Sequence, residues 1–268
     1  MREVGNRRLL WTAAWSVIAF LYLPILVMAL FSFNDSEFTG LPFRGFTLRW
    51  YGALLDDPQV LRSIGNSVCV ALGAVAISVL FGLPAAIALD RHQFPGKAFF
   101  RSIVLLPIVL PGVITGVSLL LFYVLLHFKL SLYTVILGQG TALMCVTITE
   151  VFARLEQVGR SREEAALDLG ANPWEVFRHV TFPGIRSALA GAVLIAFSIS
   201  FDEIAVTYLL TGRQNTLPMT LWSMLRRSAT PEVNAISTLF VAASIALITA
   251  GMSFARRGQI RKAKFQWT

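Results

Sequence analysis

Long apolar runs separated by short polar segments dominate this chain. A helix needs about 20 consecutive apolar residues to cross a bilayer, and six runs reach or approach that length. They cover residues 9–33, 64–89, 102–126, 131–153, 188–210 and 236–254. The first run exceeds the roughly 7 to 15 apolar residues of a signal peptide, so we interpret it as an uncleaved span. The pattern predicts an all-α integral membrane protein with six transmembrane helices in a single domain, residues 1–268.

Prolines interrupt three of these runs. Pro24 and Pro84 lie inside the first and second runs, and Pro107 and Pro111 fall in the first half of the third. Because proline removes a backbone hydrogen-bond donor, we expect these helices to be kinked. The kinks favour two interpretations equally, namely helices arranged around a pathway or irregular helix packing.

A charged insert, residues 154–186, separates the fourth and fifth runs. Its first half predicts a helix over residues 162–169. Ser161 is a suitable N-cap, and the acidic residues of the first turn would be stabilised by the positive end of the helix dipole. Gly170 is expected to end this helix.

The second half of the insert predicts another short helix, over residues 174–179. Asn172 and Pro173 form its start. The N–H of the first helical residue has no acceptor within the helix, so a proline, which lacks this group, is tolerated there. We expect Phe182 and Pro183 to end it. Such a helix-turn-helix is typical of a docking element, although an ordinary amphipathic loop has a similar pattern.

Composition and charge agree with a membrane protein. The chain is 56% hydrophobic and 14% charged, with a mean hydropathy of +0.67, which lies outside the range of soluble proteins. If the runs cross the membrane alternately, 16 of the 23 Lys and Arg residues fall on the side of both termini and the insert. The positive-inside rule therefore predicts that both termini are cytoplasmic. The net charge of +8 reflects topology and attraction to lipid headgroups, and does not indicate nucleic-acid binding.

The residues that would carry catalysis or metal binding are missing. The three histidines are far apart in sequence, and Cys69 and Cys145 both fall inside predicted spans, where we interpret them as small core residues. Residues 95–98 lack the glycine spacing and the hydroxyl of a phosphate-binding loop. We therefore expect a protein that is not an enzyme, has no cofactor of its own and does not hydrolyse ATP.

Acidic residues inside the runs are the main candidates for a solute pathway. Asp202 and Glu203 lie just past the middle of the fifth run, where one charged residue costs about 2.5 to 3.5 kcal/mol to insert. They indicate either an acidic lining for a cationic solute or an interhelical hydrogen-bond network. Glu150 is a weaker candidate, because it lies four residues before Arg154, which is the spacing of an ordinary helix ion pair, and this favours a structural role.

The insert resembles the EAA loop, the coupling helices of permease subunits in bacterial ATP-binding-cassette (ABC) importers. The residues that carry this resemblance are Glu164, Ala165, Ala166, Gly170, Phe182 and Pro183. In that family the loop lies in a cleft of the cytosolic ATPase subunit. The resemblance therefore implies an ATPase-coupling role for these residues and for Pro173, with Glu164 meeting a basic residue of the partner.

The whole chain is similar to the spermidine/putrescine class of importer permeases, most closely to the C-type subunit of polyamine importers. The similarity rests on motifs at residues 66–67, 88–97, 106–107, 200–203, 210–212 and 231–235 and on the EAA loop. The chain departs from this pattern in the fourth run, where relatives often carry a histidine and then a proline and this chain has Gln139 and Cys145.

This resemblance implies a type I ABC importer permease of the MetI-like fold in the bacterial inner membrane. Its partners would be a dimer of ABC ATPases that binds ATP and Mg²⁺, a second related permease and an extracytoplasmic solute-binding protein. The solute would be a polyamine or related organic cation, and Phe201 and Tyr208 would join Asp202, Glu203 and Glu150 along its path. An amino-acid derivative, an opine, iron or thiamine are alternative solutes.

Two other classes are weighed against the importer. A secondary transporter or channel explains spans and acids but leaves the insert unexplained, and an intramembrane enzyme requires a nucleophile or metal cluster that the sequence lacks. One further segment, residues 217–227, predicts an amphipathic helix. Such a helix lies in the membrane interface or, in an importer, faces the delivering protein.

Overall fold

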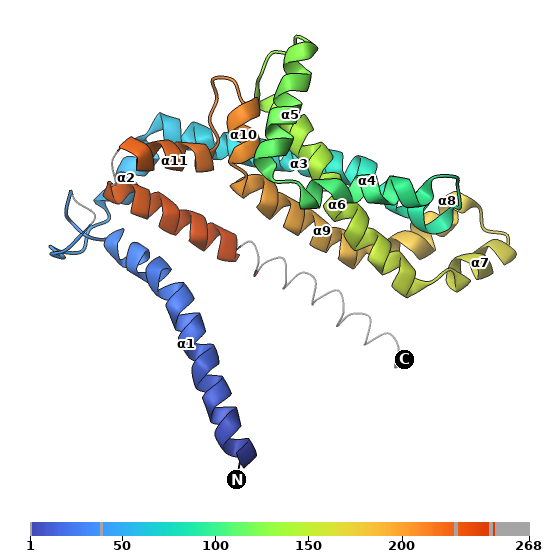
Figure 1. Cartoon of the computed structure of the whole chain (residues 1–268), viewed down its shortest axis with the longest axis horizontal. Helices are drawn as coiled ribbons and strands as arrows, with labels where there is room; N and C mark the ends of the chain where they lie inside the picture. The colour runs from blue at the N-terminus through green and yellow to red at the C-terminus, as the bar shows by residue number, and fades with distance from the viewer. Residues whose placement is uncertain (1, 38–39, 228–229, 247–248, 250–268) are drawn as a thin grey trace. The chain divides into compact units, whose positions relative to one another are not determined.

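The computed structural model describes residues 2–37, 40–227, 230–246 and 249, which are almost entirely helical (Figure 1). Within these residues the pairing of extended backbone is limited to an isolated bridge between Asn34 and Phe46. The helices in chain order are α1 (Arg2–Phe31), α2 (Arg49–Asp56), α3 (Pro58–Arg91), α4 (Lys97–Val109), α5 (Gly112–Leu125), α6 (Leu132–Val158), α7 (Ser161–Asp168), α8 (Pro173–Val176), the π-helical turn η1 (Phe177–Thr181), α9 (Phe182–Asp202), α10 (Ala205–Leu210) and α11 (Leu217–Arg227).

In the described part of the chain, four helical stretches are long and apolar enough to cross a membrane, and a bent pair of helices raises the number to five if the pair counts as one span. The stretches are Leu10–Phe31, Pro58–Arg91, Leu132–Val158 and Pro173–Asp202, with the pair Lys97–Val109 and Gly112–Leu125. A further apolar helix, Pro231–Ala246, overlaps the sixth predicted run, residues 236–254. Residues 247–248 and 250–254 of that run lie outside the described residues. The prediction of a multi-pass helical membrane protein is confirmed, and the count of six stays a prediction.

The chain divides into two compact units, which we describe separately. The first comprises Met1–Leu61 and Thr220–Ser244, and the second Arg62–Met219 and Ile245–Thr268. In the first, the segment after α1 folds around the buried side chain of Asn34. The Asn34 side-chain oxygen accepts a hydrogen bond from the backbone N–H of Arg44 at 2.9 Å, and its carbonyl accepts one from the Trp50 indole at 2.8 Å.

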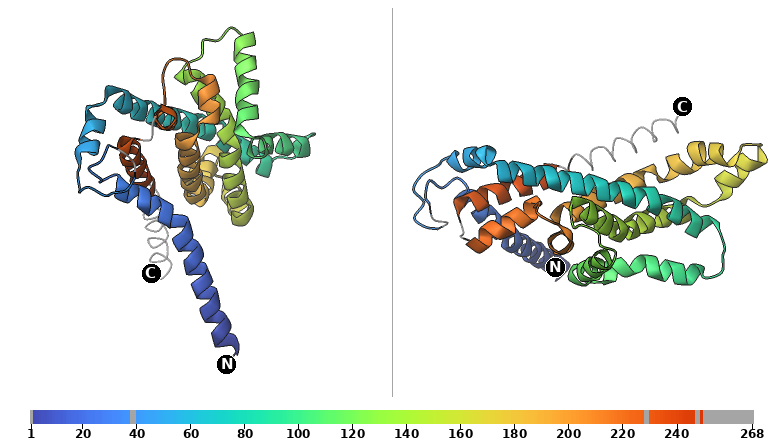
Figure 2. Two further views of the ribbon diagram at one scale, coloured as in Figure 1. Left: turned by 60° about the vertical axis from the view of Figure 1, so that its left-hand side comes forward. Right: turned by 90° about the horizontal axis from the view of Figure 1, so that it is seen from above.

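Close helix packing organises the second unit, in which α6 packs along α9 and against α3 (Figure 2). Small residues make the contact possible. An added Cβ atom at Gly140 of α6 would lie 2.8 Å from the side chain of Ile77, and one at Gly82 of α3 would lie 2.9 Å from that of Thr147. The buried Ser78 hydroxyl bonds the Leu143 carbonyl at 2.8 Å. Small residues and polar links of this kind are typical of helices that associate in a membrane. Cys145 is buried in this core as expected, whereas Cys69 is exposed.

The third apolar run forms two helices instead of one kinked span. Helices α4 and α5 meet at an angle of 110°. The break lies at Leu110 and Pro111, where the backbone of Leu110 is extended with ψ of 131°. A residue before proline is driven out of the helical conformation by a clash with the proline ring, which explains the position of the bend.

The fifth run also differs from the prediction. The expected stop at Phe182 and Pro183 is wrong, since α8, η1 and α9 form one helical stretch from Pro173 to Asp202. In the π turn the N–H of Phe182 donates a hydrogen bond to the carbonyl of Phe177, five residues earlier. The next residue, Pro183, has no N–H to donate. The helix ends at Asp202 because Glu203 is extended, with ψ of 116°. Asp202 and Glu203 therefore lie at a helix break and not near the middle of a helix.

Candidate functional site

The first helix of the insert ends as the sequence predicts. The N–H of Gly170 bonds the Leu167 carbonyl at 2.9 Å, and the N–H of Ala171 bonds the Ala166 carbonyl at 3.1 Å. This is the Schellman pattern, which requires a left-handed residue, and Gly170 has φ of +85°. The helix starts one residue earlier than expected, so Ser161 is its first residue and not its N-cap.

The second helix of the insert begins at a reciprocal cap. The Asn172 side chain accepts a hydrogen bond from the backbone of Glu175, and the Glu175 carboxylate accepts one from the backbone of Asn172, both at 2.9 Å. Pro173 follows as the first helical residue. The turn between α7 and α8 is thus held by local hydrogen bonds on both sides.

The insert exposes an apolar surface next to acidic side chains. Leu169 is 89% exposed and Trp174 65% exposed, and the Trp174 ring stacks on Phe177 with ring centroids 5.4 Å apart. Glu164 and Ala165 are exposed, Phe182 is partly exposed, and Ala166 and Pro183 are half-buried. An exposed aromatic and aliphatic pair is typical of a surface that another protein covers.

Sequence reasoning missed the contact that ties the insert to α3. One carboxylate oxygen of Glu163 accepts hydrogen bonds from the Arg91 guanidinium and from the Thr181 hydroxyl, both at 2.7 Å. The Arg91 guanidinium also pairs with Asp90, and Arg160 donates to the Asp90 carbonyl. The sequence offered one signal of this contact, which is that Arg91 lies within the motif at residues 88–97 that resembles the permease family.

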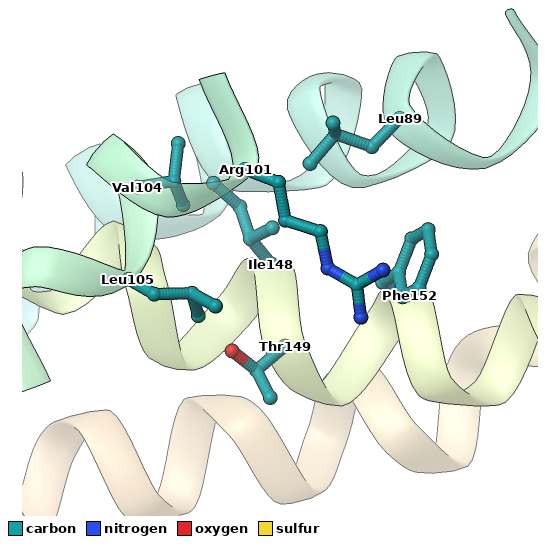
Figure 3. Close-up of a pocket in the computed structure, with 7 residues that line it drawn as sticks. All are labelled: Leu89, Arg101, Val104, Leu105, Ile148, Thr149 and Phe152. Atoms are coloured by element: carbon teal, nitrogen blue, oxygen red, sulfur yellow. The ribbon is translucent and has the colours of Figure 1, made fainter. Parts of the chain in front are cut away.

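A cleft of about 390 Å³ opens beside this contact. Its lining combines charged and apolar side chains: Ile87, Arg91, His92, Arg160, Glu163, Glu164, Leu167, Pro173, Val176, Phe177 and Thr181. A second, much smaller pocket of about 60 Å³ lies between α3, α4 and α6 (Figure 3). There the Arg101 guanidinium lies 4.9 Å from the centre of the Phe152 ring. This volume is too small for an organic solute, for which sites of about 300 to 1,000 Å³ are usual.

The break between α9 and α10 is stabilised by Glu203. Its carboxylate accepts a hydrogen bond from the backbone N–H of Val206 at 3.0 Å, and its carbonyl accepts one from the Thr207 hydroxyl at 2.8 Å. The same carboxylate lies beside Gly112, the first residue of α5, where an added Cβ would be 3.4 Å away. Two helix starts therefore face this acid, and a carboxylate is favoured at the positive end of a helix.

Gln139 connects this break to α6. The side-chain amide donates to the Thr207 hydroxyl at 2.8 Å, and its oxygen accepts a hydrogen bond from the Ser200 hydroxyl. All three residues are buried. Gln139, one of the two positions at which we expect the chain to depart from polyamine permeases, thus lies at the centre of a buried polar network.

The other candidates for a pathway do not form one cluster. Asp202 and Tyr208 are exposed, and Phe201 stacks on Phe197 with centroids 5.7 Å apart. In the described part of the chain the Asp202 carboxylate has no hydrogen bond or ion pair. Glu150 is exposed and lies 11 residues along α6 from Gln139, which bonds Ser200 next to the break, so about 16 Å of helix separates Glu150 from the level of the break.

The expected ion pair of Glu150 with Arg154 is wrong. Among the described residues, Arg154 instead donates to the Gly184 carbonyl and to the Gln157 side chain, both at 3.2 Å. The same part of the chain holds no group of three or more His, Cys, Asp or Glu side chains that could bind a metal ion.

Comparison with known families assigns the chain to a class of transport protein. Residues 78–261, more than half of the chain, match the model of the family described as binding-protein-dependent transport system inner membrane component. The chain belongs to this family. It is therefore a membrane permease component of a transport system.

Two relatives resemble this chain over most of its length. The spermidine/putrescine transport system permease protein PotC of Escherichia coli (strain K12) is 30% identical over 242 residues, covering 90% of this chain and 91% of the relative. The putrescine transport system permease protein PotI of the same strain is 36% identical over 232 residues, covering 84% and 82%.

A solved structure supports the fold. A chain of a bacterial ABC transporter involved in the import of the acidic polysaccharide alginate superposes with a TM-score of 0.71 at 18% identity, covering 94% of this chain and 96% of that chain. At this identity the likeness shows the permease fold and carries no information on the solute.

Proposed function

We propose that this permease is a translocation subunit of an ATP-driven, binding-protein-dependent ABC importer that carries a polyamine or a related small organic cation. The observation that carries the solute class is the similarity to two polyamine permeases over more than four fifths of the chain. The Asp202 carboxylate, which lies at a helix break and has no partner among the described residues, supports it, because a cationic solute offsets a negative charge that is costly at membrane depth.

The energy source acts from another subunit. The exposed surface formed by Leu169, Trp174 and Glu164 fits a partner ATPase, which binds ATP and Mg²⁺ and hydrolyses ATP. The basic residues around the insert support a cytoplasmic position for this surface. An extracytoplasmic solute-binding protein, which the description of the family supports, and a second, related permease complete the proposed assembly. Closure of the ATPase pair then moves the insert and switches the helices between two access states.

Of the two adjacent acids, Asp202 is the better candidate for contact with the solute. Glu203 is already bonded to the start of α10, whereas Asp202 is exposed and unpaired among the described residues. Glu203 then has a structural role, since its removal frees backbone and hydroxyl groups at the break. This assigns different roles to two acids that the sequence alone does not distinguish.

The test compares Asp202→Asn with the wild type in membranes that contain the assembled complex. We expect uptake of radiolabelled spermidine to fall by about tenfold, because the cation loses a charge partner worth on the order of 1.4 kcal/mol in a low-dielectric path. Co-purification of the ATPase subunit should not change. Asp56→Asn is the matched control, since Asp56 is an exposed acid on α2. Normal uptake by Asp202→Asn contradicts the cation path, and loss of assembly assigns Asp202 a structural role.

A further inference from the structure

The side chains of Arg91, Glu163 and Thr181 form a three-way contact, which we call the clasp. Arg91 ends α3, Glu163 lies in the first turn of α7, and Thr181 ends the π turn that leads into α9. Both donors reach the same oxygen of Glu163 at 2.7 Å. A single carboxylate therefore fastens α7 both to the end of α3 and to the turn that leads into α9.

Burial makes this contact stiff. The side chains of Arg91 and Glu163 are 12% and 13% exposed, and Thr181 is buried. Salt screens a pair of this kind much less than a surface pair. Removal of one partner leaves a charge that has lost most of its water, which makes separation of the clasp costly. The insert and the end of α3 are thus expected to move together.

The N-terminal part of α3 within the second unit is hydrogen-bonded to the segment between α10 and α11. The Asn66 amide donates to the Asn215 carbonyl at 2.8 Å, and the Ser67 hydroxyl accepts a hydrogen bond from the backbone N–H of Leu217 at 2.8 Å. Ser67 and Arg91 are 24 residues apart on one helix, which corresponds to about 36 Å. Helix α3 therefore connects the insert at one end with residues 211–217 at the other.

We propose that the clasp transmits the movement of α7, the first helix of the insert, to α3 and to the turn that leads into α9, and that α3 carries it to residues 211–217. This proposal rests on the proposed function, because the movement originates in a bound ATPase. Glu163 is a positioning residue in this mechanism. Its role differs from that of its neighbour Glu164, which is exposed and available to the partner.

The test separates binding of the ATPase from coupling. Thr181→Val removes one hydrogen bond of the clasp with little change in shape, and Glu163→Gln removes its charge. In complexes reconstituted with a spermidine-binding protein, we expect both variants to retain the ATPase subunit. The number of spermidine molecules transported per ATP hydrolysed should fall by about tenfold, the loss expected for a hydrogen bond to a charged group. Thr181→Ser, which keeps the hydroxyl, should restore the ratio.

Glu156→Gln is the matched control, because Glu156 is an exposed acid at the end of α6 that takes no part in the clasp. A normal ratio in Thr181→Val and Glu163→Gln overturns the proposal. Equal loss of ATPase binding and transport in both variants also overturns it, since the clasp then only maintains the fold of the insert. A wild type that binds no ATPase subunit rejects the proposed function itself, which is a distinct outcome.

Discussion

Glu203 and Gln139 show how single polar residues hold an irregular backbone inside an apolar bundle. Between them they satisfy the Val206 N–H and the hydroxyls of Ser200 and Thr207 at the break between α9 and α10. In a membrane such groups have no water to bond, so an unpaired one costs several kcal/mol. The break is therefore a specified feature of the chain.

Gly170 is the residue of the insert whose substitution is most informative. At φ of +85° other residues are strained, although open space surrounds the position of its missing Cβ. We expect Gly170→Asp to insert in the membrane normally and to abolish solute-stimulated ATP hydrolysis in the assembled complex, because the added carboxylate and the strained turn disturb the surface of the insert. ATPase assays with and without spermidine and its binding protein measure this effect.

The control for Gly170→Asp is the substitution Gly191→Ala. Gly191 is a helical glycine of α9 that also has open space around its missing Cβ. If spermidine stimulates ATP hydrolysis in the Gly170→Asp complex to near wild-type levels, this turn has no coupling role.

Local sequence signals predicted some of these residues and not others. The stop at Gly170 and the cap at Asn172 follow from chemistry within a few residues, and both are confirmed. The partners of Glu163 and Gln139 are different, since Arg91 precedes Glu163 by 72 positions and Ser200 follows Gln139 by 61. A hydrophobic pattern identifies faces of helices but does not specify which polar groups meet across them.

At the scale of elements, the apolar pattern located spans better than it located their breaks. The amphipathic helix α11 has the bounds 217–227 that the sequence predicts, because its pattern is local. The runs at 102–126 and 188–210 are each divided, at Pro111 and at Glu203. Hydropathy is averaged over about 20 residues, so a single residue with extended backbone inside an apolar run does not change the averaged value.

Contact between α3 and α6 depends on glycine. We expect Gly140→Leu to lower the melting temperature of the detergent-purified protein and its yield, because a side chain there overlaps Ile77 and overpacking costs about 1 to 3 kcal/mol. Gly65→Leu is the control, since Gly65 lies on α3 with open space around it. Equal melting temperatures for the two variants would show that the helices do not pack closely at Gly140.

At the scale of the whole molecule, the distribution of basic residues predicts orientation. A reporter inserted near Gly159 or fused after Thr268 should be cytoplasmic, and one inserted near Pro58 or Gln214 should be outside. Paired reporters that are active on only one side of the membrane measure this directly. A cytoplasmic signal at Gln214 would contradict the six-span topology and with it the position of α11 on the outer side.

The central claim is that this chain forms the path of an ATP-driven importer of organic cations. The most direct measurement is uptake of radiolabelled spermidine by liposomes that contain the purified complex and a spermidine-binding protein, with either ATP or a non-hydrolysable analogue supplied to the ATPase. We predict uptake with ATP and none with the analogue or without the binding protein. Uptake that continues with the analogue, driven by an ion gradient, would contradict the account and place the protein among secondary transporters or channels.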